Sequence, residues 1–402
     1  MEEKLIERLV QRIQNANDEI LIEIGKALKK MGSLNTANIH KIQQQLKYGE
    51  SLQKIVKIIT KMSNLTEKDI YNILESVAKN DLEFSKIYYE AKKIDFIPYE
   101  KNEPLKMLVN EIAQSTMQTY QNISRTAGIT FLNANKERIT SPIINAYWQI
   151  IDDSALKVAQ GKIAFEKALK DQIKVLGSSG IKSIEYESGR TKRLDSAIRM
   201  NMQDALSQLA IGQQQIMGEQ FGTDAYEVSV HEYPAPDHED IQGHKFDIDN
   251  WNKLQDYTYM GKFKDVNGKV YIRDSGNPIR AIGTLNCRHI AFSTILEAPP
   301  RYTQEQLNQI NKRNEKGFDF EDKHYSLYNG AQLLKQLELQ LRDLKSQQVL
   351  ARASGQLEEA QKYQRNINVL TDKYNQITQI SGLPTFKERM SVSKYRKIKV
   401  KK

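Results

Sequence analysis

The side chains best suited to chemistry lie close together in this sequence. Four of the six histidines and the only cysteine fall between His231 and His289. One string contains His231, His238 and His244, and the other is Asn286-Cys287-Arg288-His289. Imidazole and thiol groups bind metals, transfer protons and act as nucleophiles. The specific chemistry of the chain is therefore expected in this stretch.

Zinc is the first ligand to consider, because it prefers four ligands drawn from thiolate, imidazole and carboxylate groups. The two strings offer five candidates: His231, His238, His244, Cys287 and His289. The spacing is not that of a zinc finger, and no paired Cys-x-x-Cys is present. Alternatively, Cys287 is a small buried apolar group and the histidines form hydrogen bonds at strand ends. We expect no cofactor, with a structural zinc as the open alternative.

Two catalytic arrangements could use the same residues. In one, Cys287 is a nucleophile, a histidine is its base and an aspartate orients that base. However, no glycine-rich turn that would form an oxyanion hole accompanies it. In the other, Asp237, Glu239 and Asp240 join the histidines in a metal-dependent nuclease, although similar acidic sets occur in many surface loops. The sequence also lacks a Walker motif and a dinucleotide-binding fingerprint.

The positive charge of the chain is concentrated at its end. The net charge is +9, and the last 19 residues, from Pro384, hold eight Lys or Arg residues against one Glu. Such a tail could contact nucleic-acid phosphates or an acidic partner surface, or it could be a solvated flexible end. The residues expected to make the contact are Lys394, Arg396, Lys397, Lys399, Lys401 and Lys402.

The composition indicates a water-soluble protein of more than one compact unit. Hydrophobic residues make up 39% and charged residues 27% of the 402 residues, which suits extensive helical surface. The first residues do not resemble a secretory signal, and no apolar run approaches the roughly 20 residues that a membrane helix needs. One cysteine cannot form an internal disulfide. We expect an aqueous, reducing environment.

Apolar periodicity predicts mainly helix up to about Phe221, with Gly32 ending the first helix and Pro104 opening a later one. A short strand is expected at 184–187. Between Asp224 and Arg301 the period changes to alternation, and Asn267-Gly268 predicts a hairpin.

After Tyr325 the leucines step by three and four residues, and Gly355 interrupts the pattern. This spacing predicts two coiled-coil-like helices folded back as an antiparallel hairpin. The predicted fold is mainly α with a small α+β domain. Its parts are a helical N-terminal region (1–180), a central mixed domain (181–324), a helical hairpin (325–383) and a basic C-terminal tail (384–402).

Taken together, the strings resemble the bacteriophage minor capsid protein 2 family, which is related to Mu F-type head-morphogenesis proteins. The resemblance covers about residues 180–395, whereas the N-terminal third matches only in helical character. Ala235 and Ile241 depart from the family pattern, which commonly has Arg and an aromatic residue there. The matching positions are Arg193, Ala197, Arg199, Glu227, Val228, Ser229, His231, Pro236, His238, Gln242, Gly243, Asn286, Cys287, Arg288, His289, Tyr328, Gln332, Glu338, Gly382, Leu383 and Arg389.

The resemblance implies a non-enzymatic structural protein of a tailed-phage head. Such a protein would lie inside the capsid at the portal vertex, in few copies, and would act in head assembly and in DNA packaging or delivery. Its partners would be the portal protein, major capsid or scaffold proteins and packaged double-stranded DNA, with no membrane, and it would be in the host cytoplasm during assembly. Independently of the resemblance, the density of His231, His238, Cys287 and His289 near predicted strand ends leads us to expect that they hold the mixed domain together, with Arg288 as an ion-pair hub. The competing interpretation is a nuclease, a hydrolase or a toxin-like effector.

Overall fold

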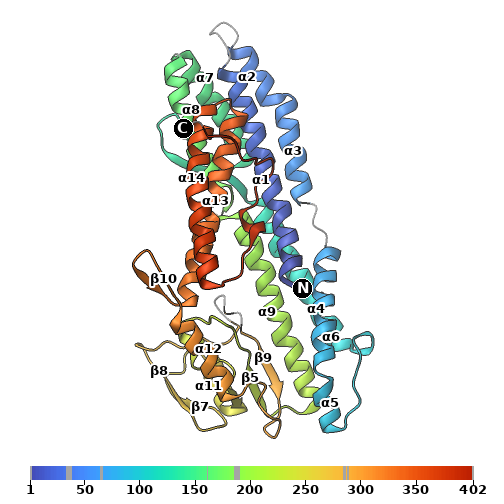
Figure 1. Cartoon of the computed structure of the whole chain (residues 1–402). Helices are drawn as coiled ribbons and strands as arrows, with labels where there is room; N and C mark the ends of the chain where they lie inside the picture. Colours follow the sequence, from blue (N-terminus) through green and yellow to red (C-terminus); the bar gives the residue numbers. More distant parts are fainter. Residues whose placement is uncertain are drawn as a thin grey trace.

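The computed structural model describes residues 2–32, 39–63, 67–160, 162–184, 191–283, 287 and 289–400. It shows an elongated molecule in which the small mixed domain lies at the lower left (Figure 1). To its right lie the lower parts of α4 (Glu67–Phe84), α6 (Glu103–Arg125) and α9 (Leu194–Phe221) and the short α5 (Lys86–Lys92), and the other long helices lie above. This confirms the predicted fold class, mainly α with a small α+β part. Among the described residues, no helix combines the length and apolarity needed to cross a membrane.

The first half of the chain forms a helical body around one long helix, α1 (Glu2–Gly32). Ile13, Ile20, Ile24 and Leu28 of α1 are buried at helical intervals in the largest apolar core. As predicted, α1 ends at Gly32. The other helices of the body are α2 (Ile39–Tyr48), α3 (Glu50–Ser63), α4 (Glu67–Phe84), α5 (Lys86–Lys92), η2 (Tyr99–Lys101), α6 (Glu103–Arg125), α7 (Ile143–Ala159), α8 (Lys162–Ser179) and α9 (Leu194–Phe221).

A four-stranded antiparallel sheet lies within this body, and its first half corrects the sequence prediction. The strands β1 (Ala127–Leu132), β2 (Arg138–Pro142), β3 (Ile181–Ile184) and β4 (Thr191–Arg193) pair in the order β2-β1-β3-β4. The segment 127–142 was predicted to be helical. Instead, the Asn133 side chain accepts hydrogen bonds from two backbone N–H groups, those of Asn135 and Glu137, and this turn closes a hairpin. The strand expected at 184–187 is described only at Ile184, the last residue of β3, and 185–187 lie outside the described residues.

The small domain has its own sheet and core. Strands β5 (Ala225–Val228), β6 (Lys245–Asp247) and β9 (Ala291–Thr294) pair in the order β6-β5-β9. The predicted hairpin is present as β7 (Gly261–Lys264) and β8 (Val270–Arg273), with Gly268 in the left-handed region at φ +86°. Two helices complete the domain, α10 (Pro236–Glu239) and α11 (Ile248–Gln255).

A second long pair of helices returns from the small domain to the body. After α12 (Gln304–Lys316) and the short strands β10 (Phe318–Phe320) and β11 (Lys323–Tyr325), α13 (Leu327–Ala353) and α14 (Leu357–Ser381) form the predicted antiparallel hairpin. Gly355, at φ +82°, lies in its turn. Helix α13 also packs on α8, where a Cβ on Gly177 would come within 2.5 Å of Gln347. Glycine is therefore required for this close approach.

The basic C-terminal segment is anchored through its backbone along the α13–α14 hairpin, after η3 (Lys387–Met390). The Gln348 side chain donates to the Arg396 carbonyl (2.9 Å), and the Ile398 N–H donates to Gln364 (3.2 Å). The side chains of Lys394, Arg396, Lys397 and Lys399 remain exposed, whereas Lys401 and Lys402 lie outside the described residues.

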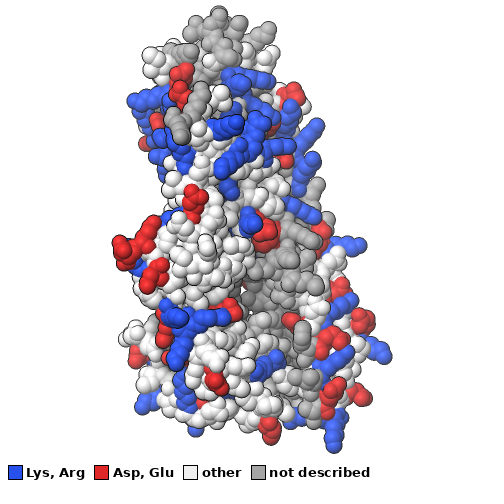
Figure 2. Space-filling model, viewed as in Figure 1, with Lys and Arg blue, Asp and Glu red and all other residues white. Residues whose placement is uncertain are grey.

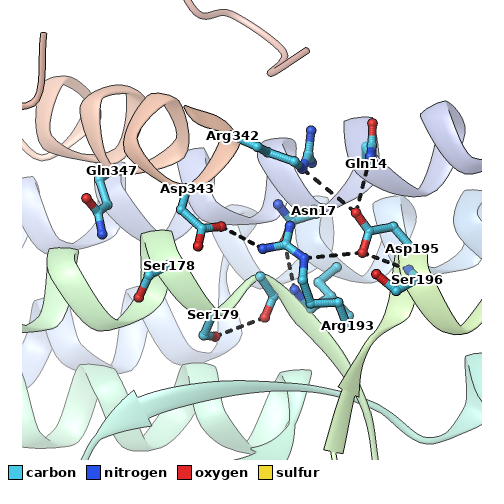
Figure 3. Close-up of polar contacts among 12 residues, drawn as sticks. Gln14, Asn17, Ser178, Ser179, Arg193, Asp195, Ser196, Arg342, Asp343 and Gln347 are labelled. Carbon is cyan, nitrogen blue, oxygen red and sulfur yellow. Dashed lines mark hydrogen bonds and ion pairs between the residues drawn. The ribbon is translucent and has the colours of Figure 1, made fainter. Parts of the chain in front are cut away.

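A buried ion network ties the start, middle and end of the chain together (Figure 3). Arg342 of α13 is 1% exposed and pairs with Asp18 of α1 (3.4 Å) and Asp195 of α9 (3.8 Å). Arg193 pairs with Asp195 (3.3 Å) and with Asp343 of α13 (2.7 Å). Arg342 also donates to the Ser391 carbonyl of the C-terminal segment. Three helices and the C-terminal segment therefore meet at one buried point.

Replacing Arg342 with Ala should strongly destabilise the helical body. Loss of one partner of a buried ion pair leaves the other charge uncompensated, which costs about 3–5 kcal/mol. Urea denaturation followed by far-UV circular dichroism measures the change in unfolding free energy. The matched control is Arg365→Ala on exposed α14 surface, which should change it by no more than about 0.5 kcal/mol. Equal effects of the two substitutions would contradict the role given to the network.

Candidate functional site

A cavity of about 1030 Å³ lies between the small domain, α9 and α13. It is lined by residues from each part of the chain that resembles the minor capsid protein 2 family. Residues on one side come from the β4–α9 junction, α13 and the segment after α14, and those on the other side come from the small domain. The lining residues that were singled out from the sequence are Arg193, Arg199, His231, His238, Cys287, His289, Tyr328, Gln332, Glu338 and Arg389.

Three side chains at the small-domain wall form a tight buried cluster. The His238 Nδ1 and His289 Nδ1 atoms are 3.3 Å apart, and the Cys287 Sγ atom is 3.3 Å from the first and 3.5 Å from the second. His238 is 0% exposed, Cys287 is 7% exposed and His289 is 5% exposed. Among the described residues, these three side chains bring their ligand atoms close enough together to hold a metal ion. We call them the His–Cys cluster.

The outer nitrogen of each clustered histidine faces an oxygen atom. His238 Nε2 is 3.0 Å from the Arg280 carbonyl, and His289 Nε2 is 3.3 Å from Gln242 Oε1. The same Gln242 oxygen accepts a hydrogen bond from the His231 backbone N–H (2.9 Å). Carbonyl and amide oxygens can only accept hydrogen bonds, so each Nε2 atom must carry the proton that it donates. In a neutral imidazole the Nδ1 atom then carries the lone pair.

Burial keeps the cluster neutral. The pKa of His289 is lowered to about 3. Burial is the largest cause, followed by the positive charges that His231 and His238 would carry. Burial also lowers the pKa of His238 and raises the pKa of the Cys287 thiol. Around neutral pH the protein alone therefore presents two neutral imidazoles and a protonated thiol.

Two of the five predicted metal ligands are not part of the cluster. His244 is buried, but its Nδ1 is 2.5 Å from Asp265 Oδ2 beside the β7–β8 hairpin. The His231 ring packs edge-on against His289, with centroids 4.4 Å apart, and lines the cavity. The sequence strings therefore contained the right residue types, but spacing could not show which ones meet.

The cluster is held in place by three neighbouring residues: Gln242, Gly243 and Pro236. Gln242 is 1% exposed and also donates to Asn311 of α12 (3.3 Å), which connects the cluster to the next helix. Gly243 has φ +71°, and a Cβ there would come within 2.4 Å of Leu307 of α12. Pro236 starts α10, the short helix that carries His238.

The ion pair beside the cluster is formed by a residue that the sequence analysis missed. Arg280 binds Asp237 through two contacts, Nε to Oδ2 at 2.6 Å and Nη2 to Oδ1 at 2.8 Å. The predicted hub, Arg288, lies outside the described residues, as does Asn286. Arg280 stands in no motif, so only the folded loop identifies it as the partner of Asp237.

The geometry does not favour the nuclease arrangement. Asp237 is engaged by Arg280, the Glu239 carboxylate accepts a hydrogen bond from Asn314 (2.9 Å), and the Asp240 side chain is 80% exposed. These carboxylates therefore do not converge with the histidines on one ion, as a metal-dependent nuclease requires.

The nucleophile arrangement has part of the required geometry but the wrong electrostatics. His238 lies between Cys287 and Asp237, with its Nε2 atom 3.6 Å from Asp237 Oδ2. A reactive cysteine needs a lowered thiol pKa, whereas burial raises the pKa of Cys287. Burial therefore disfavours the thiolate form that a nucleophilic cysteine needs.

On the opposite wall, charged residues pair across helices. Arg199 of α9 and Arg389 of η3 both pair with Glu7 of α1, and Arg389 also lies 3.7 Å from Glu338 of α13. The family-like positions Arg199, Glu338 and Arg389 thus brace this wall.

Comparison with known families gives a match over most of the chain. The model of a family described as phage minor capsid protein 2 matches residues 2–378. The match includes the N-terminal helices, which the sequence strings related to that family only by helical character. Neither the search of curated proteins nor the search of solved structures finds a match.

Replacing Gly243 with Ala should destabilise the small domain. The matched control is Gly222→Ala, since Gly222 has the same φ of +71° but nothing within 4 Å of an added Cβ. Both changes carry the left-handed penalty of about 1–2 kcal/mol. Gly243→Ala adds overpacking against Leu307, at about 1–3 kcal/mol.

In a Trp148→Phe background, Trp251 of α11 is the sole tryptophan and its fluorescence reports unfolding of the small domain in urea. If Gly222→Ala costs as much as Gly243→Ala, the close packing of Gly243 on α12 is not what the position requires.

Proposed function

Because this chain belongs to the phage minor capsid protein 2 family, we propose that it is a structural head protein of a tailed phage that lies inside the capsid at the portal vertex. The observation that carries this proposal is the family match over residues 2–378. In this position the protein would be present in few copies and would act in head morphogenesis and in DNA packaging or delivery.

The shape of the molecule supports a binding role. The long helices form a braced body, and the β7–β8 hairpin stands at the other end of the molecule (Figure 1). Val270 and Ile272 of β8 are 55% and 46% exposed on one face of that hairpin, and exposed apolar groups of this kind are typical of protein contacts. The body and the α13–α14 hairpin offer further docking faces. The partners we propose are the portal protein first, and the major capsid or scaffold proteins second.

The exposed basic side chains support contact with an anionic partner. Figure 2 shows Lys and Arg side chains gathered over the upper part of the molecule, where the helical body lies. Burial and the neighbouring positive charge of Arg396 lower the pKa of Arg352, so like charges are held close together there. We assign packaged double-stranded DNA to this surface, through Lys394, Arg396, Lys397 and Lys399, with an acidic portal surface as the alternative.

We further propose that the cavity performs no turnover. The support is the neutral, buried thiol and the dispersed carboxylates described above. The competing activity is a metal-dependent nuclease or hydrolase. Incubation of the purified protein with DNA and divalent metals would reveal that activity, and its loss in Cys287→Ala or His238→Ala would identify the cluster as its source.

Heads that assemble without portal protein should lack this chain, whereas tailless heads that contain the portal should retain it. The reason is that a protein docked at the portal vertex needs the portal as its binding site. Quantitative mass spectrometry of the two particle types, normalised to the major capsid protein, measures the ratio. Crosslinking of portal-containing heads should join this chain to the portal. Equal amounts of the chain in both particle types would refute portal docking.

Neutralising the exposed basic strip should weaken DNA binding. The variant carries Lys394→Gln, Arg396→Gln, Lys397→Gln and Lys399→Gln, which leaves the packed backbone and Tyr395 in place. If each cation contacts one phosphate, the slope of log affinity against log salt should fall by up to about 3.6. Filter binding of double-stranded DNA across a salt series measures this slope.

The matched control removes four exposed lysines, Lys262 and Lys264 of β7 and Lys312 and Lys316 of α12. It removes the same total charge and should leave the slope nearly unchanged. If the two variants lower the affinity equally, net charge and not the strip binds DNA.

A further inference from the structure

The His–Cys cluster has fewer protons than its geometry requires. His238 Nδ1 and His289 Nδ1 both carry lone pairs, because each Nε2 donates to an oxygen. They nevertheless lie 3.3 Å apart. Among the described residues, only the Cys287 thiol offers these two nitrogens a proton, and it has one proton for two acceptors. In a buried site an unsatisfied acceptor costs free energy. A bound cation would remove this deficit.

The distances within the cluster fit a tetrahedral ion. Zinc binds histidine nitrogen at about 2.0–2.1 Å and cysteine sulfur at about 2.3 Å with tetrahedral angles. Those values place the two nitrogens about 3.3 Å apart and each nitrogen about 3.6 Å from the sulfur. The observed separations are 3.3 Å between the nitrogens, and 3.3 Å and 3.5 Å to the sulfur. Three ligand atoms are therefore already spaced as three corners of a zinc tetrahedron.

The surroundings also match a metal site. Histidine ligands of metals commonly donate their second N–H to a carbonyl or carboxylate group, which fixes the tautomer and the ring orientation. Here the Arg280 carbonyl and the Gln242 amide oxygen receive those protons. Gln242 is itself held by the His231 N–H and by Asn311. The ligand atoms are thus oriented by a second set of hydrogen bonds.

We propose that His238, Cys287 and His289 bind one zinc ion. Zinc is the ion of choice because one soft thiolate and two imidazoles suit it better than they suit calcium or magnesium, which prefer oxygen ligands. On binding, the thiol proton passes to solvent and the thiolate charge is balanced by the ion. The three ligands line the cavity, so the fourth position is open to a water molecule. The ion links α10 to the segment that leads into β9.

This proposal does not depend on which head protein the chain contacts. The zinc would hold the loop that carries Cys287 and His289 against α10, and the Arg280–Asp237 ion pair would hold the same loop from its other side. Metal binding is therefore expected to stabilise the small domain, and removal of the metal should affect the helical body less.

The first experiment uses the full chain, purified without chelator and reconstituted with zinc. We expect about one zinc per chain by elemental analysis, retained on dialysis against buffer. Cys287→Ser and His238→Ala should each lose at least about nine-tenths of it, because loss of one of three ligands weakens a zinc site strongly. The matched control is His324→Ala, which removes an exposed histidine of the β10–β11 hairpin and should retain full stoichiometry.

A second measurement on the wild-type chain keeps the test valid if the variants fail to fold. Replacing zinc with cobalt should give a thiolate-to-cobalt charge-transfer band and the visible spectrum of a tetrahedral ion, since Cys287 is the sole cysteine. A strong chelator should abolish both and, in the Trp148→Phe background, lower the melting temperature reported by Trp251 fluorescence. Zinc that stays bound in folded Cys287→Ser, or wild-type chain that binds no zinc on reconstitution, would overturn the proposal.

Discussion

Among the residues that the structure describes, Arg342 is the largest side chain that is almost fully buried, and its charge constrains how the chain folds. A buried guanidinium is tolerated only where carboxylates and carbonyls surround it. These come from α1, α9 and the C-terminal segment, up to 324 positions away in sequence. Burial raises the pKa of Asp18 and of Asp343 to about 6, whereas Arg193 and Arg342 lower that of Asp195 to about 2 against the effect of burial. Movement of one helix would leave a buried charge without its ion-pair partner. The network therefore holds the two ends of the chain in place.

The cavity follows from this arrangement, because Arg193, Asp195 and Arg342 form part of its wall. The network links α9 to α13 through the Arg342–Asp195 pair, and the small domain is inserted in the chain between these two helices. It therefore faces the gap that they leave open. Ten of the residues that resemble the minor capsid protein 2 family, from Arg193 to Arg389, line this cavity. A pattern that looks like several separate strings in sequence is one surface in space.

The sequence predicted those features whose physics is local. Helical periodicity located α1 and α13, Asn267-Gly268 located the β7–β8 hairpin and Gly355 located the turn between α13 and α14. The β1–β2 hairpin was missed because its strands are too short to show a clear period, although the turn residue Asn133 was visible. The ion network could not be predicted, since nothing in the sequence indicates that Asp18 and Arg342 are partners. The five candidate ligands were found as a set, but Asp265 binds His244 and only the fold brings His238 to Cys287 and His289.

The two buried polar sites of this protein differ in how their charge and protons are balanced. In the network, each guanidinium faces carboxylates of the same chain, so opposite charges are paired within the protein. In the His–Cys cluster, the described residues offer one thiol proton to two inward-facing nitrogen lone pairs, whereas both outer nitrogens donate to oxygen atoms. A site built solely for packing would gain nothing from orienting both Nδ1 atoms inward, because apolar side chains of similar volume would fill the same space without leaving an acceptor unsatisfied. A bound cation therefore explains the inward orientation of the two Nδ1 atoms better than packing does. The ligand that this orientation requires would bind in the small domain.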